Sequence, residues 1–554
     1  MTRARPRPVV IFLVCSVLFL AGLGSSSLWD VDETRNARAA EEMMQRGDLV
    51  VPTVNGEVRA HKPPLHYWFM ILAYKLFGVR EFSARVFAAL FGLGTVLLVT
   101  SVGVNALGSG AGLLAGLVLG VSFLFTVSSR SATTDAFLVF FTNAAVLAGY
   151  FSSRGRLWTV AAWAAMGFAV LAKGPVGVVL PLGALILFRL TDGHGPRGLL
   201  GLFHPAGILV FVAIAAPWYV LAAARTEGDL VAGFFLKHNV GRFLKPMESH
   251  GGPIYYYLAI LLPGFFPWAA FLPQALSHGF RSPRFAGRFP GFLRLQVIWA
   301  GVVLVFFSLA RTKLPNYILP AFPALALLTG AWIDSLGASP KVGFRGRTVS
   351  WLVTLLPAAF FPALFTVALT MRAPEFVSLA WLSVPLAAAG LVGLVGHLRR
   401  MAPSPVFRAV AYTTAVGELF IHFFLVPRLE PLRMAPRLGR AVSRTAGPSD
   451  TVASLGFSRP ALYFYGKRPV VRVGDEAAVR AFLAEPGGRF LVATEELFGR
   501  LPADVRGSLK VLESGLDALD TNAFVLVAER VGPGAGPGVR PPGKGEGKDG
   551  GGGG

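Results

Sequence analysis

The stretch "LWDVDETRNARAAEEMMQRGDLVVP", residues 28–52, follows directly on an apolar run and at once presents Asp32, Glu33 and Arg35. Acidic residues favour the amino end of a helix, so the pattern predicts a helix from about Asp32 to Arg46 that Asp32 caps. Charges at the mouth of a hydrophobic segment are either solvated loop residues or part of an active site at a membrane surface. The rest of the chain decides between these two interpretations.

The composition is typical of a membrane protein. Of the 554 residues, 54% are hydrophobic and only 15% are charged, whereas a soluble domain carries roughly 25% charged residues. The apolar residues come in blocks of about 17 residues or more, the length that crosses a hydrocarbon core of roughly 30 Å as a helix. We therefore predict a polytopic α-helical membrane protein.

We count about thirteen candidate membrane-spanning helices of this length. They cover residues 8–26, 82–105, 109–127, 134–151, 157–172, 174–190, 205–223, 254–275, 293–309, 316–334, 350–371, 375–397 and 406–426. The first span also has the arginine-rich start of a signal peptide, but no clear A-x-A cleavage site follows it. In either case residue 28 emerges on the outer face of the membrane.

The formal net charge of +22 at first suggests nucleic acid as a partner. Arginine in short cytoplasmic loops, which orients membrane helices, explains the charge better. We therefore expect no nucleic acid, and membrane lipids with anionic headgroups are the natural partners. The same bias predicts a cytoplasmic N-terminus and, since the span count is odd, a C-terminus on the outer face of the membrane. The one cysteine, Cys15, excludes an intrachain disulfide.

The chain divides into three predicted parts. Residues 1–430 form the transmembrane domain, with interfacial helices in the first outer loop at 28–81. Residues 447–530 alternate short β-branched or aromatic runs with helical stretches, which predicts a small soluble α/β domain on the outer face. Residues 531–554 are rich in Gly and Pro, cannot build a core and are predicted to be disordered.

Ionisable residues gather in five of the predicted outer loops. Together with one phenol they are Asp32, Arg35, Lys62, Asp135, Lys173, Arg242, Lys313 and Tyr317. A transporter more often places such residues near mid-membrane, and the later spans hold only Glu418, so we predict that the outer face is the working face. Each residue also has a structural explanation: Asp32 and Asp135 stand where they can cap helices, and Lys173 can anchor a helix end at the interface.

The stretch "DETRNARAAEEMMQRGDLVVPTVNGEVRAHKPPLHYW", residues 32–68, resembles the first outer loop of bacterial polyprenyl-phosphate-sugar glycosyltransferases. In that family a D-E-x-R-Y-A helix precedes "GDWVVP" and a K-P pair. The matches here are Asp32-Glu33, Arg35, "GDLVVP" and Lys62-Pro63. "LAKGPVG" and "KLPNYILPAFPALALL" are similar to two further segments of the family. The chain resembles the aminoarabinose transferases that modify lipid A and, more distantly, the protein O-mannosyltransferases.

The resemblance implies a GT-C fold, in which a helix bundle carries active-site loops on the periplasmic side and a soluble C-terminal domain. It also implies that the donor is a sugar on undecaprenyl phosphate and that a lipid or a glycan accepts the sugar. Transfer to an acceptor hydroxyl requires a proton to leave, which a carboxylate can accept. On this basis Asp32 is assigned as the catalytic carboxylate and Asp135 as the second one.

The leaving phosphate gains negative charge, so cations directed at it favour the transition state over the ground state. The residues assigned to the donor phosphate are Arg35, Lys62 and Lys173, with Tyr317 as a hydrogen-bond donor and Arg242 and Lys313 as secondary contacts.

Two positions depart from the family pattern, because Asn36 replaces its Tyr and His61 replaces the acid before the K-P pair. They leave open the identity of the sugar and the presence of a divalent metal, for which the spacing of His61, His66, His238 and His250 is irregular. Three alternative functions also stay open. They are protein O-mannosyltransferase-like activity, a polyprenyl-lipid carrier without chemistry, and a binding or assembly protein on the outer face.

The substitution Asp32→Asn separates the enzyme from the carrier. The amide cannot accept the acceptor's proton, so sugar transfer is expected to be abolished while the protein still inserts and folds. Transfer of radiolabelled sugar and the thermal stability of the purified variant measure the two properties. Near-normal turnover of Asp32→Asn would refute the assignment.

Overall fold

The computed structural model of the protein describes residues 8–29, 31–191, 199–247, 250–281, 289–337, 344–370, 377, 381, 383–517 and 523–530. The chain divides into two compact units. The first, called the membrane unit below, comprises Met1–Ser26, Ala39–Pro52 and Val58–Arg428. The second, called the small unit, comprises Ser27–Arg38, Thr53–Glu57 and Leu429–Gly554. The predicted tail at 531–554 lies outside the described residues.

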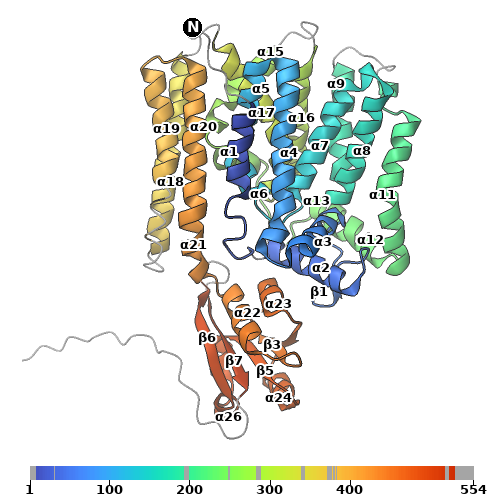
Figure 1. Ribbon diagram of the computed structural model, residues 1–554, viewed down its shortest axis with the longest axis vertical. Coiled ribbons are helices and arrows are strands. Elements are labelled where there is room, and N and C mark those ends of the chain that lie inside the picture. The colour runs from blue at the N-terminus through green and yellow to red at the C-terminus, as the bar shows by residue number, and fades with distance from the viewer. Residues whose placement is uncertain are drawn as a thin grey trace, which may run out of the picture. The chain divides into compact units, whose positions relative to one another are not determined.

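The membrane unit is built from helices (Figure 1). Its helices up to the middle of the chain are α1 (Pro8–Leu20), α3 (Leu65–Phe77), α4 (Glu81–Leu107), α5 (Ser109–Gly120), α6 (Phe123–Ser129), α7 (Asp135–Tyr150), η1 (Phe151–Arg154), α8 (Arg156–Lys173), α9 (Val176–Thr191), α11 (Pro205–Arg225), α12 (Asp229–Ala232), η2 (Gly233–Gly241), α13 (Arg242–Leu244), α14 (Tyr256–Gly264), η3 (Ala269–Phe271) and α15 (Leu272–Arg281). The later ones are α16 (Phe292–Leu309), η4 (Pro315–Ala321), α17 (Phe322–Ser335), α18 (Phe344–Thr370), α19 (Ser383–Leu398), α20 (Pro403–Phe420), η6 (Ile421–Leu425) and α21 (Val426–Leu429).

Within the described residues, six helices are long and apolar enough to cross a membrane, or up to eight if each of two bent pairs counts as one span. The bent pairs are α5 with α6, at 66°, and α14 with η3 and α15, at 117°. The prediction of an α-helical polytopic membrane protein is thus confirmed, but the count of about thirteen spans is not. Several predicted apolar runs form shorter or broken helices instead.

Small residues allow the helices of the membrane unit to approach closely, as is common in membrane proteins. Gly112 in α5 faces the backbone of α4, where an added Cβ would lie 2.1 Å from the nitrogen of Val104. On α17, a Cβ added at Gly330 would lie 2.6 Å from the carbonyl oxygen of Ala111. The sequence of α5, "SGAGLLAGLVLG", therefore packs α5 against both α4 and α17.

The first outer loop begins with α2 (Asp32–Arg46), which has the bounds that the sequence predicts. A short hairpin of β1 (Thr53–Val54) and β2 (Glu57–Val58) follows, and then α3, which carries the aromatic residues expected at an interface. Between α2 and β1, the Asp48 carboxylate accepts hydrogen bonds from the Val50 nitrogen at 2.8 Å and from Arg225 at 2.7 Å. The turn "GDLVV" is thereby fixed to α11 within the membrane unit.

The small unit contains a five-stranded sheet with the order β4-β3-β5-β7-β6. Its strands are β3 (Thr451–Leu455), β4 (Val470–Val473), β5 (Arg489–Thr494), β6 (Leu509–Asp517) and β7 (Ala523–Arg530). β3 pairs in parallel with β4 and β5, whereas β7 pairs antiparallel with β5 and β6. The helices of the unit are η7 (Glu430–Leu432), α22 (Met434–Thr445), α23 (Pro460–Gly466), α24 (Glu476–Ala484), α25 (Glu495–Arg500) and α26 (Ala503–Gly507).

The small unit starts before residue 447, where the sequence places the boundary of the outer domain. It includes α22, whose apolar side buries Leu438 and Val442 and whose first backbone nitrogen, that of Met434, donates to Asp517 at 2.8 Å. The sequence assigns residues 431–446 to neither part, because an amphipathic helix next to a membrane span does not show against which sheet it packs.

The start of the first outer loop also belongs to the small unit. The backbone nitrogen of Leu28 donates to the Tyr465 hydroxyl at 2.7 Å, and Arg433 donates to the carbonyl oxygen of Leu28 at 2.7 Å. The guanidinium of Arg433 also lies 4.4 Å from the ring centre of Trp29. Further along, Asn55 exchanges two hydrogen bonds with the backbone of Val470, at 3.1 and 2.9 Å. The residues just before α2 are therefore held by the C-terminal part of the chain.

Arg433 is only 1% exposed, so Arg433→Met leaves the carbonyl oxygen of Leu28 without its charged donor. We expect a loss of about 2 kcal/mol in unfolding free energy and faster proteolysis around Trp29. Thermal unfolding and limited proteolysis in lipid nanodiscs measure the two effects. The matched control is Arg444→Met, at an exposed position; equal stability of both variants would contradict the role given to Arg433.

Candidate active site

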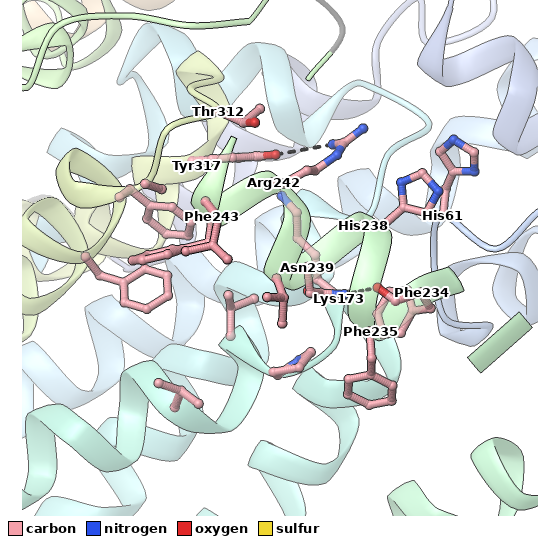
Figure 2. Close-up of a pocket in the computed structure, with 18 of the residues that line it drawn as sticks. His61, Lys173, Phe234, Phe235, His238, Asn239, Arg242, Phe243, Thr312 and Tyr317 are labelled. Atoms are coloured by element: carbon pink, nitrogen blue, oxygen red, sulfur yellow. Dashed lines mark hydrogen bonds between the residues drawn. The ribbon is translucent and has the colours of Figure 1, made fainter. Parts of the chain in front are cut away.

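A cavity of about 350 Å³ opens in the membrane unit (Figure 2). Its walls come from the end of α8, the start of α9, the π-helical segment η2, α13, the end of α16 and η4. The lining residues are His61, Lys62, Lys173, Pro175, Val176, Val179, Phe234, Phe235, His238, Asn239, Val240, Arg242, Phe243, Leu244, Phe306, Phe307, Ala310, Thr312 and Tyr317. Segments that are far apart in the sequence thus meet around one space.

The lining combines positive charge with apolar surface. Lys62, Lys173 and Arg242 are its charged members, and no Asp or Glu belongs to the lining as the structure describes it. Most of the other lining side chains are aromatic or aliphatic, and Phe234, Phe235 and Phe243 are seen around the cavity in Figure 2. Such a cavity suits an anionic group attached to an apolar body, because cations stabilise the anion and the apolar body is removed from water.

Lys173 is the last residue of α8, and the glycine after it is required by the local geometry. Gly174 has a φ of +83°, and a Cβ added there would lie 2.4 Å from the ring of Phe234. Only a glycine adopts this conformation without strain. The sequence "AKGP" therefore ends the helix and turns the chain directly at the cavity.

The ammonium of Lys173 forms an ion pair with Asp135. Asp135 is the first residue of α7 and is 4% exposed, and its other carboxylate oxygen accepts a hydrogen bond from the Asn316 amide at 2.7 Å. The Lys173 nitrogen also lies 4.9 Å from the ring centre of Tyr317. Three elements, α7, α8 and η4, thus fix one lysine that lines the cavity.

Arg242, the first residue of α13, also contacts Tyr317. Its guanidinium donates to the Tyr317 hydroxyl at 3.4 Å (Figure 2). The backbone around Arg242 is held as well, because its carbonyl oxygen accepts from the Thr312 nitrogen and that of Phe243 accepts from the Arg311 nitrogen, both at 3.0 Å. The second cation of the cavity is therefore positioned by backbone pairing as well as by its side chain.

Three histidines lie at or near the cavity. His61 and His238 both line it, with ring centres 3.9 Å apart. His66 is fully buried, and burial followed by the nearby charges of Lys62 and Arg59 lowers the pKa of His66 well below its usual range. Its ring is therefore uncharged at neutral pH. Among the residues that the structure describes, no group of three or more His, Cys, Asp or Glu side chains could hold a metal ion.

The structure brings together four of the predicted substrate-binding residues, since Lys62, Lys173, Arg242 and Tyr317 line one cavity. Asp135 stands directly behind Lys173. Asp32 and Arg35 lie in the first turn of α2, in the small unit, and their roles stay predictions.

Lys313 is assigned from the sequence as a secondary contact of the phosphate, but in the structure its side chain has other partners. Its ammonium donates to the carbonyl oxygens of Ser308 at 2.7 Å and Ala310 at 2.8 Å, at the carboxyl end of α16. Burial, and secondly the charge of Arg311, lower the pKa of Lys313. A cation that satisfies the last carbonyl groups of a helix stabilises that helix end, and Lys313 is not among the lining residues.

Three polar residues of the site do not stand out in the sequence. Asn316 holds Asp135, Thr312 accepts from the Met247 nitrogen at 3.1 Å, and Asn239 donates to the carbonyl oxygen of Phe234 at 2.8 Å. Asn239 lies in η2, and π-helical segments often occur at functional sites but have no simple sequence signature. Asn316 and Thr312 flank the motif "KLP", which is the one signal that could have drawn attention to them.

Comparisons with known proteins give a consistent result. Residues 9–227 match the family model of dolichyl-phosphate-mannose-protein mannosyltransferase. The undecaprenyl phosphate-alpha-4-amino-4-deoxy-L-arabinose arabinosyl transferase of Pectobacterium carotovorum is 33% identical over 356 residues, which are 62% of this chain and 62% of that enzyme. An uncharacterized protein of Aquifex aeolicus is 27% identical over 487 residues, which are 87% of this chain and 91% of that protein.

The fold resembles that of a solved structure over nearly the whole chain. It is the crystal structure of ArnT from Cupriavidus metallidurans bound to undecaprenyl phosphate, with a TM-score of 0.79 and 25% sequence identity. The likeness covers 96% of this chain and 99% of that one. It confirms the predicted fold class, a helical membrane protein of the GT-C type with a small sheet-containing unit.

The glycine at the end of α8 provides a test of the site's geometry. Gly174→Ala forces a side chain into a left-handed conformation and against Phe234, so we expect a loss of about 1–3 kcal/mol in stability and weaker anion binding in the cavity. Thermal unfolding and binding of a polyprenyl phosphate measure these effects. Gly183→Ala is the control, because an added Cβ there meets nothing within 4 Å. A Gly174→Ala variant that behaves like this control would show that the turn does not shape the cavity.

Proposed function

Because the chain belongs to the ArnT-like family of integral-membrane glycosyltransferases of the GT-C class, we propose that its cavity binds the phosphate and the adjoining lipid of a polyprenyl-phosphate-linked sugar. The enzyme transfers that sugar to an acceptor at the periplasmic face of the bacterial inner membrane. The observation that supports this proposal most directly is the convergence of Lys62, Lys173, Arg242 and Tyr317 on one cavity with aromatic walls.

The two kinds of surface in the cavity match the two parts of such a donor. A guanidinium can hold phosphate oxygens through two parallel hydrogen bonds, and an ammonium acts as a compact point charge. Lys62, Lys173 and Arg242 therefore bind the phosphate, and the Tyr317 hydroxyl supplies a further hydrogen bond. The phenylalanine walls receive the polyprenyl chain, since burying apolar surface contributes roughly 25 cal/mol per Å².

The same cations also act during transfer. The bond between the anomeric carbon and the phosphate oxygen breaks as the acceptor attacks, and the electron pair goes to the leaving phosphate. Cations fixed before the reaction stabilise this developing charge without reorganising, which is commonly the largest single contribution to catalysis. Lys173 and Arg242 meet this requirement because each is held by several contacts.

The proton of the acceptor hydroxyl passes to a carboxylate, and we assign this role to Asp32 in the first turn of α2. Arg35, three residues further along the same helix, is assigned to the donor phosphate. Asp135, the second predicted carboxylate, acts on Lys173 rather than on the acceptor, because one oxygen pairs with Lys173 and the other with Asn316.

The acceptor is a lipid, including one like lipid A, or a glycan. The Pectobacterium carotovorum relative is named as a transferase of aminoarabinose. Asn36 and His61 depart from the family pattern, so the sugar that this chain transfers has to be identified independently. A protein hydroxyl is the alternative acceptor, and the mannosyltransferase model that matches residues 9–227 favours including it in the test.

The experiment uses the full chain in lipid nanodiscs with a panel of radiolabelled undecaprenyl-phosphate sugars and a membrane extract. We expect label to appear in one lipid or glycan product and to disappear from the donor, and the product identifies both the sugar and the acceptor. Label in protein would support the O-mannosyltransferase-like alternative. Bound donor without any labelled product would instead support a carrier.

Tyr317→Phe tests the donor site more finely, because it retains the ring beside Lys173 and removes the hydroxyl that accepts from Arg242. A hydrogen bond to a charged group contributes about 1.5–3 kcal/mol, so we expect at least a tenfold rise in KM for the donor. Steady-state kinetics with varied donor and fixed acceptor measure it. Tyr412→Phe, in α20, is the control, and equal kinetics of the two variants would contradict the assignment.

A further inference from the structure

We propose that Asn316 is a positioning residue for the donor phosphate. It holds one oxygen of Asp135, and Asp135 thereby fixes the ammonium of Lys173 at the cavity wall. This inference rests on the proposed function for the identity of the anion, but the link from Asn316 through Asp135 to Lys173 can be measured without it.

Each of the two carboxylate oxygens of Asp135 has its own contact. Oδ1 pairs with the Lys173 ammonium, and Oδ2 accepts from the Asn316 amide nitrogen at 2.7 Å. Asp135 is 4% exposed and is not a lining residue, whereas Lys173 is one. The carboxylate is thus behind the cavity wall and acts on the anion only through the lysine.

A carboxylate needs two contacts to direct a lysine. The terminal torsion of an aspartate is broad, so one ion pair alone lets the carboxylate rotate and the flexible lysine follow it. The Asn316 amide removes this freedom by fixing the second oxygen. An amide is also suited to this position because it donates a hydrogen bond without adding charge, so the carboxylate keeps its full attraction for Lys173.

The segment that carries Asn316 contacts two of the three cations that line the cavity, Lys173 and Arg242. The next residue, Tyr317, places its ring 4.9 Å from the Lys173 nitrogen and its hydroxyl 3.4 Å from the Arg242 guanidinium. η4 contains Pro315 and Pro320, which restrict its backbone. Consecutive side chains of one rigid segment therefore set the positions of the two cations.

The other end of η4 has its own attachment to α7, which provides a matched control. The Asn143 amide donates to the carbonyl oxygen of Pro320 at 3.1 Å and accepts from the Trp299 indole nitrogen at 2.9 Å. Asn143 thus also joins α7 to η4 but does not touch Asp135. A general loosening of the two elements would follow from changes at either asparagine, whereas loss of the lysine's position should follow only from changes at Asn316.

The first test measures the reactivity of Lys173 itself, in the full chain in lipid nanodiscs. Labelling with acetic anhydride and peptide mass spectrometry give the rate at each lysine. In Asn316→Ala we expect Lys173 to be labelled several-fold faster than in the wild type, because its ammonium is no longer held. Asn143→Ala is expected to lower thermal stability and leave the labelling of Lys173 as in the wild type. Unchanged labelling of Lys173 in Asn316→Ala overturns the inference.

The second test measures binding of undecaprenyl phosphate and the kinetics of transfer. Asn316→Ala is expected to weaken binding and raise the donor KM about tenfold, with an unchanged KM for the acceptor. A wild type that binds no undecaprenyl phosphate, combined with faster Lys173 labelling in Asn316→Ala, would refute the proposed function and leave the positioning of Lys173 standing. The proposed function and the positioning of Lys173 by Asn316 can therefore be refuted independently of each other.

Asn316→Asp tests the donor role of the amide and preserves its size. Two adjacent carboxylates cannot both be charged without mutual repulsion, so they share one proton. The protonated form can donate a hydrogen bond as the amide does, so donor binding should be near normal at low pH and fall as pH rises. Lys173, Lys62 and His66 are the other titratable groups that act on Asp135, and they are common to the wild type. A pH profile of binding identical to that of the wild type would overturn the inference.

Discussion

The ion pair between Asp135 and Lys173 is the interaction on which the cavity depends. It joins the first residue of α7 to the last residue of α8. Charges in such surroundings are tolerated when they are paired and hydrogen-bonded, and here Asn316 completes the pairing. The ends of two helices and the segment η4 are therefore held together at the place where a charged ligand has to be received.

Electrostatics and apolar surface act together in this cavity. Lys62, Lys173 and Arg242 line it, and Asp135 stands behind it, so an excess of positive charge faces the interior. Much of its wall is aromatic or aliphatic, and beside an apolar wall each charge interaction is stronger than in bulk solvent. A ligand with a phosphate head and a hydrocarbon tail can contact the cations and the apolar walls at the same time. The cations stabilise a leaving phosphate most strongly, because it gains negative charge.

The small unit shows a second long-range constraint. Leu28 and Trp29, just ahead of α2, contact Arg433 and Tyr465, and Asn55 in the β1–β2 turn pairs with Val470. Two pieces of the first outer loop, Ser27–Arg38 and Thr53–Glu57, thus fold with the C-terminal part of the chain as one compact unit. The positions of Leu28 and Trp29, just before Asp32, are therefore set by contacts with the C-terminal part of the chain. The sequence of the loop alone does not reveal these contacts.

The sequence by itself determined the class of the protein, the bounds of α2, the α/β character of the C-terminal part and most of the cationic residues at the cavity. These features follow from local properties, namely the length of apolar runs, helix-capping residues and short motifs. Only the tertiary structure decided that Lys313 caps α16, that Asn316 holds Asp135, that α22 belongs to the small unit and that several apolar runs are bent or short. Each of these depends on which distant segment a side chain meets, and because packing between segments sets that choice, no local pattern could reveal it.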